Sequence, residues 1–195
     1  MPELNDLSLT DFSEELASGN PTPGGGAAAA LAGALGAALL AMVCRFTVGR
    51  ERFAAVENDV QAMLAEADAA RGRFHQAVEA DAEAYAGVGA AYRLPRATDE
   101  EKASRSAAIA AASWAAAQPP LAVAEEAASL VILCHRAADI TNPMLGSDVT
   151  TAIALVRAAI DGGAANVEAN MSGVSPEQAA ELRQRLDAAR ERGSR

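Results

Sequence analysis

The chain has 195 residues, which fits a single domain large enough to bury a substantial core. Apolar residues make up 51% of the chain but aromatic residues only 4%, and alanine dominates, which favours closely packed helices over a β-sheet. The formal net charge of −10 argues against a nucleic-acid-binding surface, because contacts with phosphates require a basic face.

The first half of the chain is predicted to form three helices. A short helix over residues 9–17 begins at an N-cap that is either Ser8 or Thr10. An Ala/Gly-rich helix follows over residues 26–48. Because it is apolar on all sides, we expect it to be buried in the centre of the fold or at a subunit interface. The third helix is long and covers about residues 52–91.

A capping box and a pair of prolines determine the predicted helices in the next part of the chain. Thr98 and Glu101 have the spacing of a capping box and predict a fourth helix that runs to about residue 117. Pro119-Pro120 then predicts a break, because proline lacks the backbone N–H that a helix interior uses. A fifth helix is expected over residues 121–138.

The last two predicted helices begin at serine residues. Ser147 is expected to cap a helix over about residues 148–171, and Ser175 to open a charged helix that ends near residue 192. No segment alternates apolar and polar residues over the length of a strand. We therefore predict an all-α fold, a single-domain bundle of about six to seven helices over residues 1–195. Within it, residues 173–195 form a charged C-terminal helix that is solvated and partly frayed.

The glycine-rich segment Pro21-Thr22-Pro23-Gly24-Gly25-Gly26 runs directly into the Ala/Gly-rich helix. A helix that begins at glycines exposes backbone N–H groups and the positive end of its dipole, which suits a carboxylate, a phosphate or a polar heterocycle. The alternative is a tight turn before a buried helix, since the spacing matches neither the dinucleotide-binding nor the Walker motif. Both interpretations stay open from the residues alone.

The uncharged segment over residues 24–44 is long enough to span a bilayer. It consists mainly of Ala and Gly, however, so its tendency to enter lipid is weak, and small residues also allow close helix packing. We expect a buried helix of a soluble protein and no membrane association, with a membrane helix as the alternative.

The cysteines and histidines predict neither a disulfide nor a metal site. Cys44 and Cys134 lie far apart in apolar helical contexts, which is typical of reduced core residues in a cytoplasmic protein. His75 and His135 have no partner at metal-ligand spacing. Residues 1–11 contain neither the basic nor the apolar region of a signal peptide. We expect no metal.

Asp81 is the first candidate for chemistry, because aspartate is a poor helix former and here lies inside a predicted helix. Tyr85 follows four residues later on the same helix face, so a carboxylate and a phenol can converge on one pocket. The alternative is a solvated carboxylate in the run Glu79, Asp81, Glu83. Spacing does not decide between them.

Several segments, taken together and in order, resemble the formiminotransferase-cyclodeaminase family, which includes stand-alone bacterial methenyltetrahydrofolate cyclohydrolases. The likeness covers roughly residues 8–172, and its most specific part is the Pro-Thr-Pro-Gly-Gly-Gly element. The other matching residues are Glu15-Leu16-Ala17-Ser18, Ala29, Leu31 to Gly36, Met42-Val43, Thr47-Val48-Gly49-Arg50, Asp81, Tyr85, Leu94-Pro95-Arg96, Arg105, Ser147-Asp148, Asn166-Val167 and Asn170.

The resemblance implies a helical, dimer-forming fold and a reduced folate as substrate. It implies hydrolysis of 5,10-methenyltetrahydrofolate to 10-formyltetrahydrofolate, without a cofactor because the methenyl carbon is already electrophilic. Two alternatives stay open: ring closure of formimidoyltetrahydrofolate with loss of ammonia, and a non-catalytic folate-binding or scaffold protein that kept the fold. The absence of a formiminotransferase domain from this chain favours the cyclohydrolase.

The resemblance also implies roles for individual residues. Asp81 occupies the position of an acidic active-site residue, and we expect Asp81 and Tyr85 to be catalytic. Asn166 and Asn170 share a helix face and can offer amide groups to the pterin ring. The residues expected to bind the rest of the folate are Pro23, Gly24, Gly25, Gly26, Arg50, Arg96 and Asp148.

Asp148 and Asn166 cannot contact the same small group if one helix carries both. They are eighteen residues apart, which is about 27 Å along a helix. At a helix start, the Asp148 carboxylate also suits the dipole and can be purely structural. Some positions depart from the family pattern: Ala27 stands where serine is expected, and Arg50 and Arg96 stand where lysine is usual. Thr141-Asn142-Pro143 also departs from the glycine-asparagine pair expected there. These departures put turnover in doubt.

Overall fold

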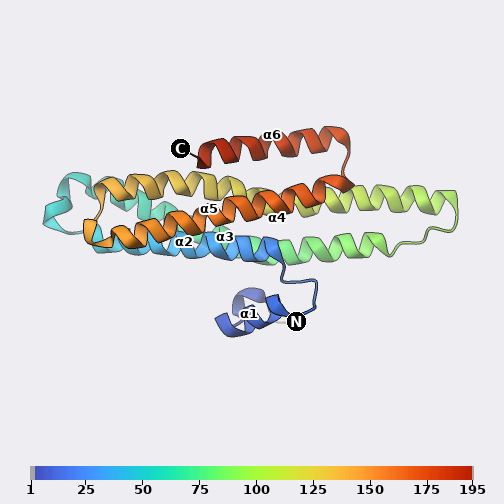
Figure 1. Ribbon diagram of the computed structural model, residues 1–195, viewed down its shortest axis with the longest axis horizontal. Helices are drawn as coiled ribbons and strands as arrows, with labels where there is room; N and C mark the ends of the chain where they lie inside the picture. Colours follow the sequence, from blue (N-terminus) through green and yellow to red (C-terminus); the bar gives the residue numbers. More distant parts are fainter. Residues whose placement is uncertain (1–2, 195) are drawn as a thin grey trace.

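The computed structural model describes residues 3–194 and is all-α (Figure 1). Within this range there is no strand, and six α-helices and four 3-10 helices follow one another along the chain. The α-helices are α1 (Leu9–Ala17), α2 (Gly25–Thr47), α3 (Glu57–Tyr92), α4 (Asp99–Ile140), α5 (Gly146–Asn170) and α6 (Pro176–Gly193). The 3-10 helices are η1 (Leu4–Asp6), η2 (Glu51–Val56), η3 (Pro143–Leu145) and η4 (Met171–Gly173).

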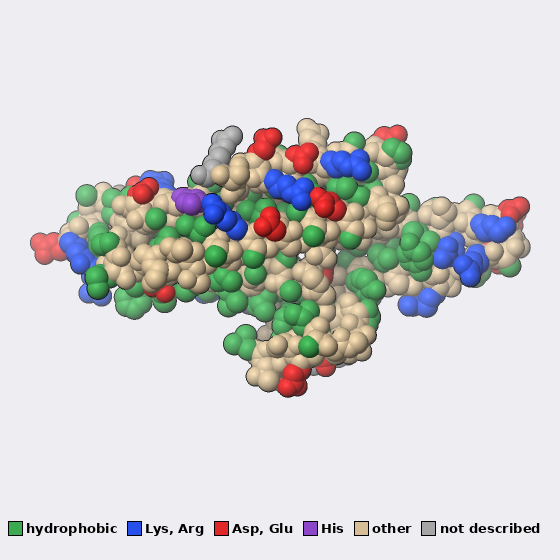
Figure 2. All heavy atoms as spheres, in the orientation of Figure 1, with side chains coloured by type: hydrophobic (Ala, Val, Ile, Leu, Met, Phe, Trp, Pro, Cys, Tyr) green, Lys and Arg blue, Asp and Glu red, His purple; other side chains and the backbone are tan. Residues whose placement is uncertain are grey.

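Four long helices, α2 to α5, lie side by side along the long axis of the molecule, and α6 lies along one side of them (Figure 1). The α3–α4 hairpin is longer than its neighbours and projects beyond them at one end. Figure 2 shows that Lys and Arg side chains gather on this projecting end. Helix α1 stands off from the bundle on the side opposite α6 (Figure 1).

Helix α2 is the buried Ala/Gly-rich element that the sequence predicts, and its small residues determine how closely its neighbours approach. A β-carbon at Gly33 would lie 2.6 Å from the Phe74 ring of α3, and one at Gly36 would lie 2.6 Å from Cγ2 of Val156 in α5. Phe74 and Val156 are themselves fully buried. Because interiors pack at crystal-like density, these glycines are what allow α3 and α5 to close on α2.

The predicted break at Pro119-Pro120 is wrong, because α4 continues through both prolines from Asp99 to Ile140. A proline in a helix interior costs about 3 kcal/mol through the missing N–H and the clash with the preceding turn. Here the surrounding residues, among them Ala117, Leu121 and Ala124, are completely buried. Burial of this segment against α5 and α2 outweighs the local cost, and the helix stays continuous.

The prediction that the C-terminal helix is solvated is wrong, because one face of α6 is buried. Leu182, Leu186 and Ala189 of α6 are buried at spacings of four and three residues, which places them on one face against the bundle. Arg185 donates two hydrogen bonds, of 2.9 and 2.8 Å, to the Glu125 carboxylate of α4. The charged composition of this helix concealed a narrow apolar stripe.

Other boundaries agree with the sequence to within a few residues. Ser8 is the N-cap of α1, and Thr98 with Glu101 forms the capping box of α4. Ser147 is not a cap, because α5 begins one residue earlier, directly after η3. The long third helix begins with a separate 3-10 turn, η2, before α3.

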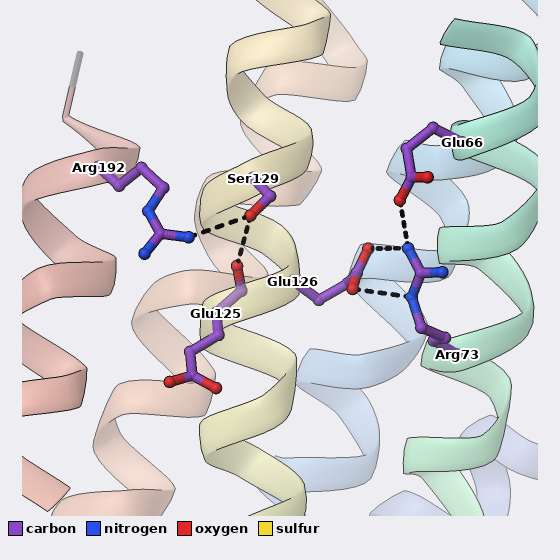
Figure 3. A network of polar contacts seen from close by, with 6 residues as sticks. All are labelled: Glu66, Arg73, Glu125, Glu126, Ser129 and Arg192. Atoms are coloured by element: carbon purple, nitrogen blue, oxygen red, sulfur yellow. Dashed lines mark hydrogen bonds and ion pairs between the residues drawn. The ribbon is translucent and has the colours of Figure 1, made fainter. Parts of the chain in front are cut away.

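Polar contacts tie α4 to its neighbours on two sides (Figure 3). Arg73 of α3 bridges Glu66 of its own helix and Glu126 of α4, and its bonds to Glu126 are 2.8 and 2.7 Å long. These carboxylates raise the pKa of Arg73 above its ordinary value. On the other side, Arg192 of α6 donates to Ser129 at 3.3 Å. The helix that carries the two prolines is thus held by α3 and α6.

The two cysteines are free and buried, as predicted. Burial raises the pKa of the Cys44 thiol to about 11 and that of Cys134 to about 12. Both thiols therefore stay protonated at neutral pH and act as small apolar core residues.

Candidate active site

The N-terminus of α2 has no cap of its own, and a side chain from α3 supplies one. Gly24 is the N-cap residue and has no side chain to accept a hydrogen bond. Instead, Oδ2 of Asp81 accepts a hydrogen bond of 3.0 Å from the backbone N–H of Ala27. The Asp81 carboxylate thus lies at the positive end of the α2 dipole, which favours a negative charge.

Gly26 leaves the space that the Asp81 carboxylate occupies. A β-carbon at residue 26 would lie 2.5 Å from Cγ of Asp81 and 2.7 Å from Oδ2, closer than atoms can approach. Glycine is therefore required here for a steric reason. The glycine-rich segment and Asp81, 55 residues apart in sequence, form one structural unit.

Two opposing effects act on the Asp81 carboxyl group. Burial raises its pKa above the ordinary value of 3.8, and the hydrogen bond from Ala27 lowers it by a smaller amount. A carboxylate whose pKa is moved toward neutral pH is a stronger base than an exposed one, and such shifts are typical of catalytic groups.

A cavity of about 220 Å³ opens beside this unit. It brings together four of the segments that the sequence singled out: the glycine turn, Asp81, Tyr85 and the asparagine pair. Tyr85 is half exposed, with 50% of its surface accessible. The lining residues are Pro21, Thr22, Gly24, Gly25, Asp81, Tyr85, Ala116, Asn166 and Asn170. Pro23 is buried within the same turn.

The two asparagines present mainly hydrogen-bond acceptors to this cavity. Nδ2 of Asn170 donates to the carbonyls of Asn166, at 2.9 Å, and Ala116, at 3.3 Å, which uses both of its N–H groups. Nδ2 of Asn166 donates to the Gly162 carbonyl at 2.8 Å. Within residues 3–194, the Oδ1 atom of neither amide accepts a hydrogen bond, and both residues line the same cavity as Asp81. This wall suits a flat ring that carries several N–H donors.

Ala116 is a site residue that sequence reasoning missed. In an unbroken helix its carbonyl would accept from the N–H of residue 120, but residue 120 is proline. The Asn170 amide takes the place of that missing donor. A proline four residues after an alanine was the signal, because it marks a carbonyl left free for a side chain.

Three residues that the family resemblance assigned to folate binding lie outside the cavity. Arg50 lines a separate hollow with Phe46 and Asn142, at the opposite end of α2, about 33 Å away by helix rise. Asp148 lies in the first turn of α5, which is unbroken as far as Asn170, so the predicted separation from Asn166 holds. Arg96 lines a groove at the projecting end of the α3–α4 hairpin.

Within residues 3–194, no three His, Cys, Asp or Glu side chains come together in a way that could hold a metal ion. The side chains that line the cavity include a carboxylate, a phenol and two amides.

Comparisons with known proteins, by sequence and by structure, all lead to one family. The family model described as formiminotransferase-cyclodeaminase matches residues 8–188. A methenyltetrahydrofolate cyclohydrolase of Methylorubrum extorquens is 38% identical over 176 residues, which is 90% of this chain and 85% of that protein. The formimidoyltransferase-cyclodeaminase of Rattus norvegicus is 33% identical over 168 residues, which is 86% of this chain but only 31% of the rat protein.

A solved structure agrees with these sequence relationships. The crystal structure of formiminotetrahydrofolate cyclodeaminase from Thermotoga maritima superimposes with a TM-score of 0.81 at 27% sequence identity. The alignment covers 98% of this chain and 96% of that one. The two proteins thus share the helical bundle along nearly its whole length.

Proposed function

The chain belongs to the formiminotransferase-cyclodeaminase family, and from this premise we propose that it hydrolyses 5,10-methenyltetrahydrofolate to 10-formyltetrahydrofolate. The single observation that carries the proposal is the Asp81 carboxylate, held by the Ala27 N–H in the wall of a cavity that Tyr85 and two asparagines also line. The 38% identity to a methenyltetrahydrofolate cyclohydrolase over most of both chains supports the same reaction.

The chemistry needs an anion and a base beside the reacting carbon. Asp81 supplies both, because its carboxylate stabilises the cationic methenyl group and accepts a proton from the attacking water. The bond from this carbon to N5 then breaks, leaving the formyl group on N10. One water proton ends on N5 and the other is released to solvent, which balances the charge of the cation. Tyr85 delivers the proton to N5.

The asparagines orient the ring. A pterin carries N–H and amino donors along one edge, and the Oδ1 atoms of Asn166 and Asn170 are acceptors fixed by their own hydrogen bonds. No cofactor takes part in this scheme, because the substrate itself carries the electrophile.

The second candidate is the cyclodeaminase reaction, which forms the same methenyl carbon from formimidoyltetrahydrofolate with release of ammonia. The likeness to the Thermotoga maritima cyclodeaminase over nearly the whole chain favours it. Non-catalytic folate binding is the third candidate, and the substitutions Ala27, Arg50 and Arg96 motivate it.

The experiment that separates these candidates follows the near-UV absorbance of 5,10-methenyltetrahydrofolate with and without the purified protein, corrected for spontaneous hydrolysis. We expect faster decay with the protein. No acceleration, together with ammonia release from formimidoyltetrahydrofolate, would assign the cyclodeaminase. Folate binding with neither reaction would identify the non-catalytic protein.

We further propose that the protein is a cytoplasmic homodimer that binds neither nucleic acid nor membranes. Three segments have the length and hydropathy of membrane spans: Gly25–Thr47, Asp99–Ile140 and Pro143–Gly173. In α2, 61% of the most apolar window is already buried inside the fold. Its remaining apolar face includes Leu35, which is 45% exposed, and Leu31, Leu39 and Met42 at helical spacing. An uncharged stripe along a single helix can pair with its own copy about a two-fold axis.

A further inference from the structure

The outward face of α2 carries an apolar stripe centred on Leu35. Helix α2 lies against α3, α5 and part of α4, and its remaining face carries no charge between Gly25 and Cys44. Figure 2 shows hydrophobic side chains along the edge of the bundle where α2 runs in Figure 1. The partly or fully exposed residues of this face, here called the α2 stripe, include Gly25, Ala28, Leu31, Leu35, Leu39, Met42 and Phe46.

The two ends of the α2 stripe are complementary in size. Ala28 and Met42 lie seven residues before and seven residues after Leu35. Gly25 lies ten residues before Leu35, and Phe46 lies eleven residues after it. At both of these levels, a small residue in the first half of the stripe thus mirrors a large residue in the second half.

This pattern favours an antiparallel pair of α2 helices over a parallel pair. A two-fold axis perpendicular to α2 at Leu35 brings each residue opposite its mirror position on a second copy. Phe46 and Met42 of each copy then pack against Gly25 and Ala28 of the other. In a parallel pair, the large residues would meet one another at one end, and the small residues would leave a gap at the other.

The active-site cavity of the single chain is small for a substrate of the proposed size. Its volume of about 220 Å³ is below the range of about 300–1,000 Å³ that is usual for ligand sites. Tyr85 in its lining is half exposed. Gly25 lines this cavity and also begins the α2 stripe. A second copy that packs on the stripe at Gly25 therefore also adds a wall to the cavity.

Phe46 is the side chain that an antiparallel second copy brings to this position. It lies in the last turn of α2, and 52% of its surface is exposed. Gly25 and Phe46 are about 32 Å apart along α2, so Phe46 cannot reach the cavity of its own chain. The axes of packed helices are about 8–10 Å apart, a distance across which a phenylalanine ring reaches the facing helix.

We propose that the chain forms an antiparallel homodimer through the α2 stripe, in which Phe46 of the partner subunit covers the active-site cavity beside Gly25. The assignment rests on the proposed function, since it takes the flat part of the pterin to lie between the partner's Phe46 and the wall formed by Asp81 and the two asparagines. An aromatic ring stacks on such a heterocycle in an offset arrangement. Each site is thus built from two chains.

Disulfide cross-linking tests the pairing without an activity assay. In the double variant Ala28→Cys/Met42→Cys, we expect oxidation to join the two subunits, because an antiparallel pair places these positions opposite each other. Within one chain they are about 21 Å apart, too far for a disulfide. The native Cys44 and Cys134 are buried and do not compete.

The two single variants, Ala28→Cys and Met42→Cys, are the matched controls for cross-linking. An antiparallel pair keeps identical positions apart, so both are expected to run as monomers in a non-reducing denaturing gel. A parallel pair would instead join each single variant to its own copy. Cross-linking of a single variant, or of none of the three proteins, would overturn the proposal.

Two matched heterodimers, isolated with two different affinity tags, test whether Phe46 acts in the opposite site. Both carry one copy of Asp81→Asn and one of Phe46→Ala, either on different chains or together on one chain opposite a wild-type partner. With the changes on different chains, one site keeps both Asp81 and the partner's Phe46, so we expect about half the kcat/KM of the wild-type dimer. With both changes on one chain, the site that keeps Asp81 loses the ring, and we expect kcat/KM to be about 10-fold lower than in the first heterodimer. Equal values, or the reverse order, would overturn the proposal.

A binding measurement separates this result from the proposed reaction. The probe is the reduced folate 5-formyltetrahydrofolate, followed by isothermal titration calorimetry. Phe46→Ala is expected to bind it about 10-fold more weakly than the wild type. The control Ile132→Ala, at an exposed position on α4, is expected to bind it like the wild type. If the protein has no hydrolase activity but shows this pattern, the assignment of the partner's Phe46 stands and the reaction fails. Equal binding by all three proteins, or binding by none, would overturn the assignment.

Discussion

The backbone of Gly26 lies directly against the carboxylate of Asp81, so that a β-carbon at residue 26 would come within 2.7 Å of Oδ2. The carboxylate in turn accepts the Ala27 N–H that no side chain of the glycine turn can bind. This contact makes the start of α2 and the middle of α3 interdependent. It also makes the position of the candidate catalytic group sensitive to a single methyl group.

Gly26→Ala is expected to displace the Asp81 carboxylate and lower kcat at least about 100-fold, since small misplacements of a catalytic group are costly. We expect a loss of stability of about 1–3 kcal/mol from overpacking. Activity assays and urea denaturation measure the two effects. Gly72→Ala is the control, because nothing lies within 4 Å of a β-carbon there and alanine favours the helix. Full activity in Gly26→Ala would contradict the assigned role of Asp81.

Asp81→Asn is expected to separate activity from stability. Burial raises the pKa of Asp81 in the folded protein, so its protonated form favours folding. That stability is present below the unfolded pKa and is lost as the pH rises through the folded pKa. An asparagine that still accepts from Ala27 is therefore expected to unfold at the same or a higher temperature at pH 7, while kcat falls at least about 100-fold.

The pH profile provides a second readout for Asp81. In the wild type, the rate is expected to fall as the pH drops through the pKa of Asp81, because the base must be ionised. Asp81→Asn is expected to lose this acidic limb of the profile. If the variant retained the limb, or if activity were lost only in parallel with thermal stability, Asp81 would be a structural cap of α2 and not the base.

Pro120→Ala is expected to weaken substrate binding without destabilising the fold. The new N–H at residue 120 would donate to the Ala116 carbonyl and compete with Nδ2 of Asn170, which donates to the same carbonyl at 3.3 Å in the wild type. We expect KM to rise several-fold and Tm to stay the same or increase, as expected when a proline leaves a helix interior. Pro119→Ala is the matched control, because the carbonyl that it would engage belongs to Ala115, which does not line the cavity. Equal KM values in the two variants would show that Asn170 does not contribute to substrate binding.

Leu182→Ala tests whether α6 is an integral part of the fold. Leu182 is completely buried, and truncating a buried leucine typically costs 2–5 kcal/mol, so we expect a loss of about 3 kcal/mol. Gln184→Ala, an exposed change on the same helix, is expected to alter stability by less than about 0.5 kcal/mol. Thermal or urea unfolding of both variants measures this difference. If the two variants were equally stable, α6 would not contribute to the stability of the fold.

Leu35→Glu tests the proposed dimer. A charge in the middle of the exposed stripe of α2 would be buried unpaired in a two-fold interface, so we expect the variant to be monomeric in analytical ultracentrifugation. Ile132→Glu is the control, because Ile132 on α4 is exposed to a similar extent, 42% against 45% for Leu35. A wild-type protein that sediments as a monomer, or a dimer unaffected by Leu35→Glu, would exclude α2 as the interface.

Local patterns were sufficient to predict most helices, because caps and periodicity act within a few residues. The limits of α1 and α2 follow from Ser8 and from the glycine turn, and both agree with the structure. The predicted break at Pro119-Pro120 failed because burial of the surrounding alanines and leucines is a tertiary effect. The burial of α6 was missed for a different reason, because its many charged residues concealed the apolar stripe of Leu182, Leu186 and Ala189.

The candidate site was only partly accessible from the sequence. The pairs Asp81 with Tyr85 and Asn166 with Asn170 follow from the spacing of four residues that places side chains on one helix face. Their convergence on the glycine turn depends on how α3 and α5 pack against α2. Ala116 could not be identified from its type, because its part in the site comes from a hydrogen bond that Pro120 cannot make.

The projecting end of the α3–α4 hairpin and the candidate active site are under different structural constraints. Its tip beyond Ala91 contributes little to the core, so changes in its length or charge have small energetic consequences for the bundle. The residues of the candidate site, by contrast, lie where α2, α3, α4 and α5 meet. Substitutions in the hairpin tip are thus expected to be tolerated, whereas substitutions at the candidate site are expected to disturb the packing of four helices.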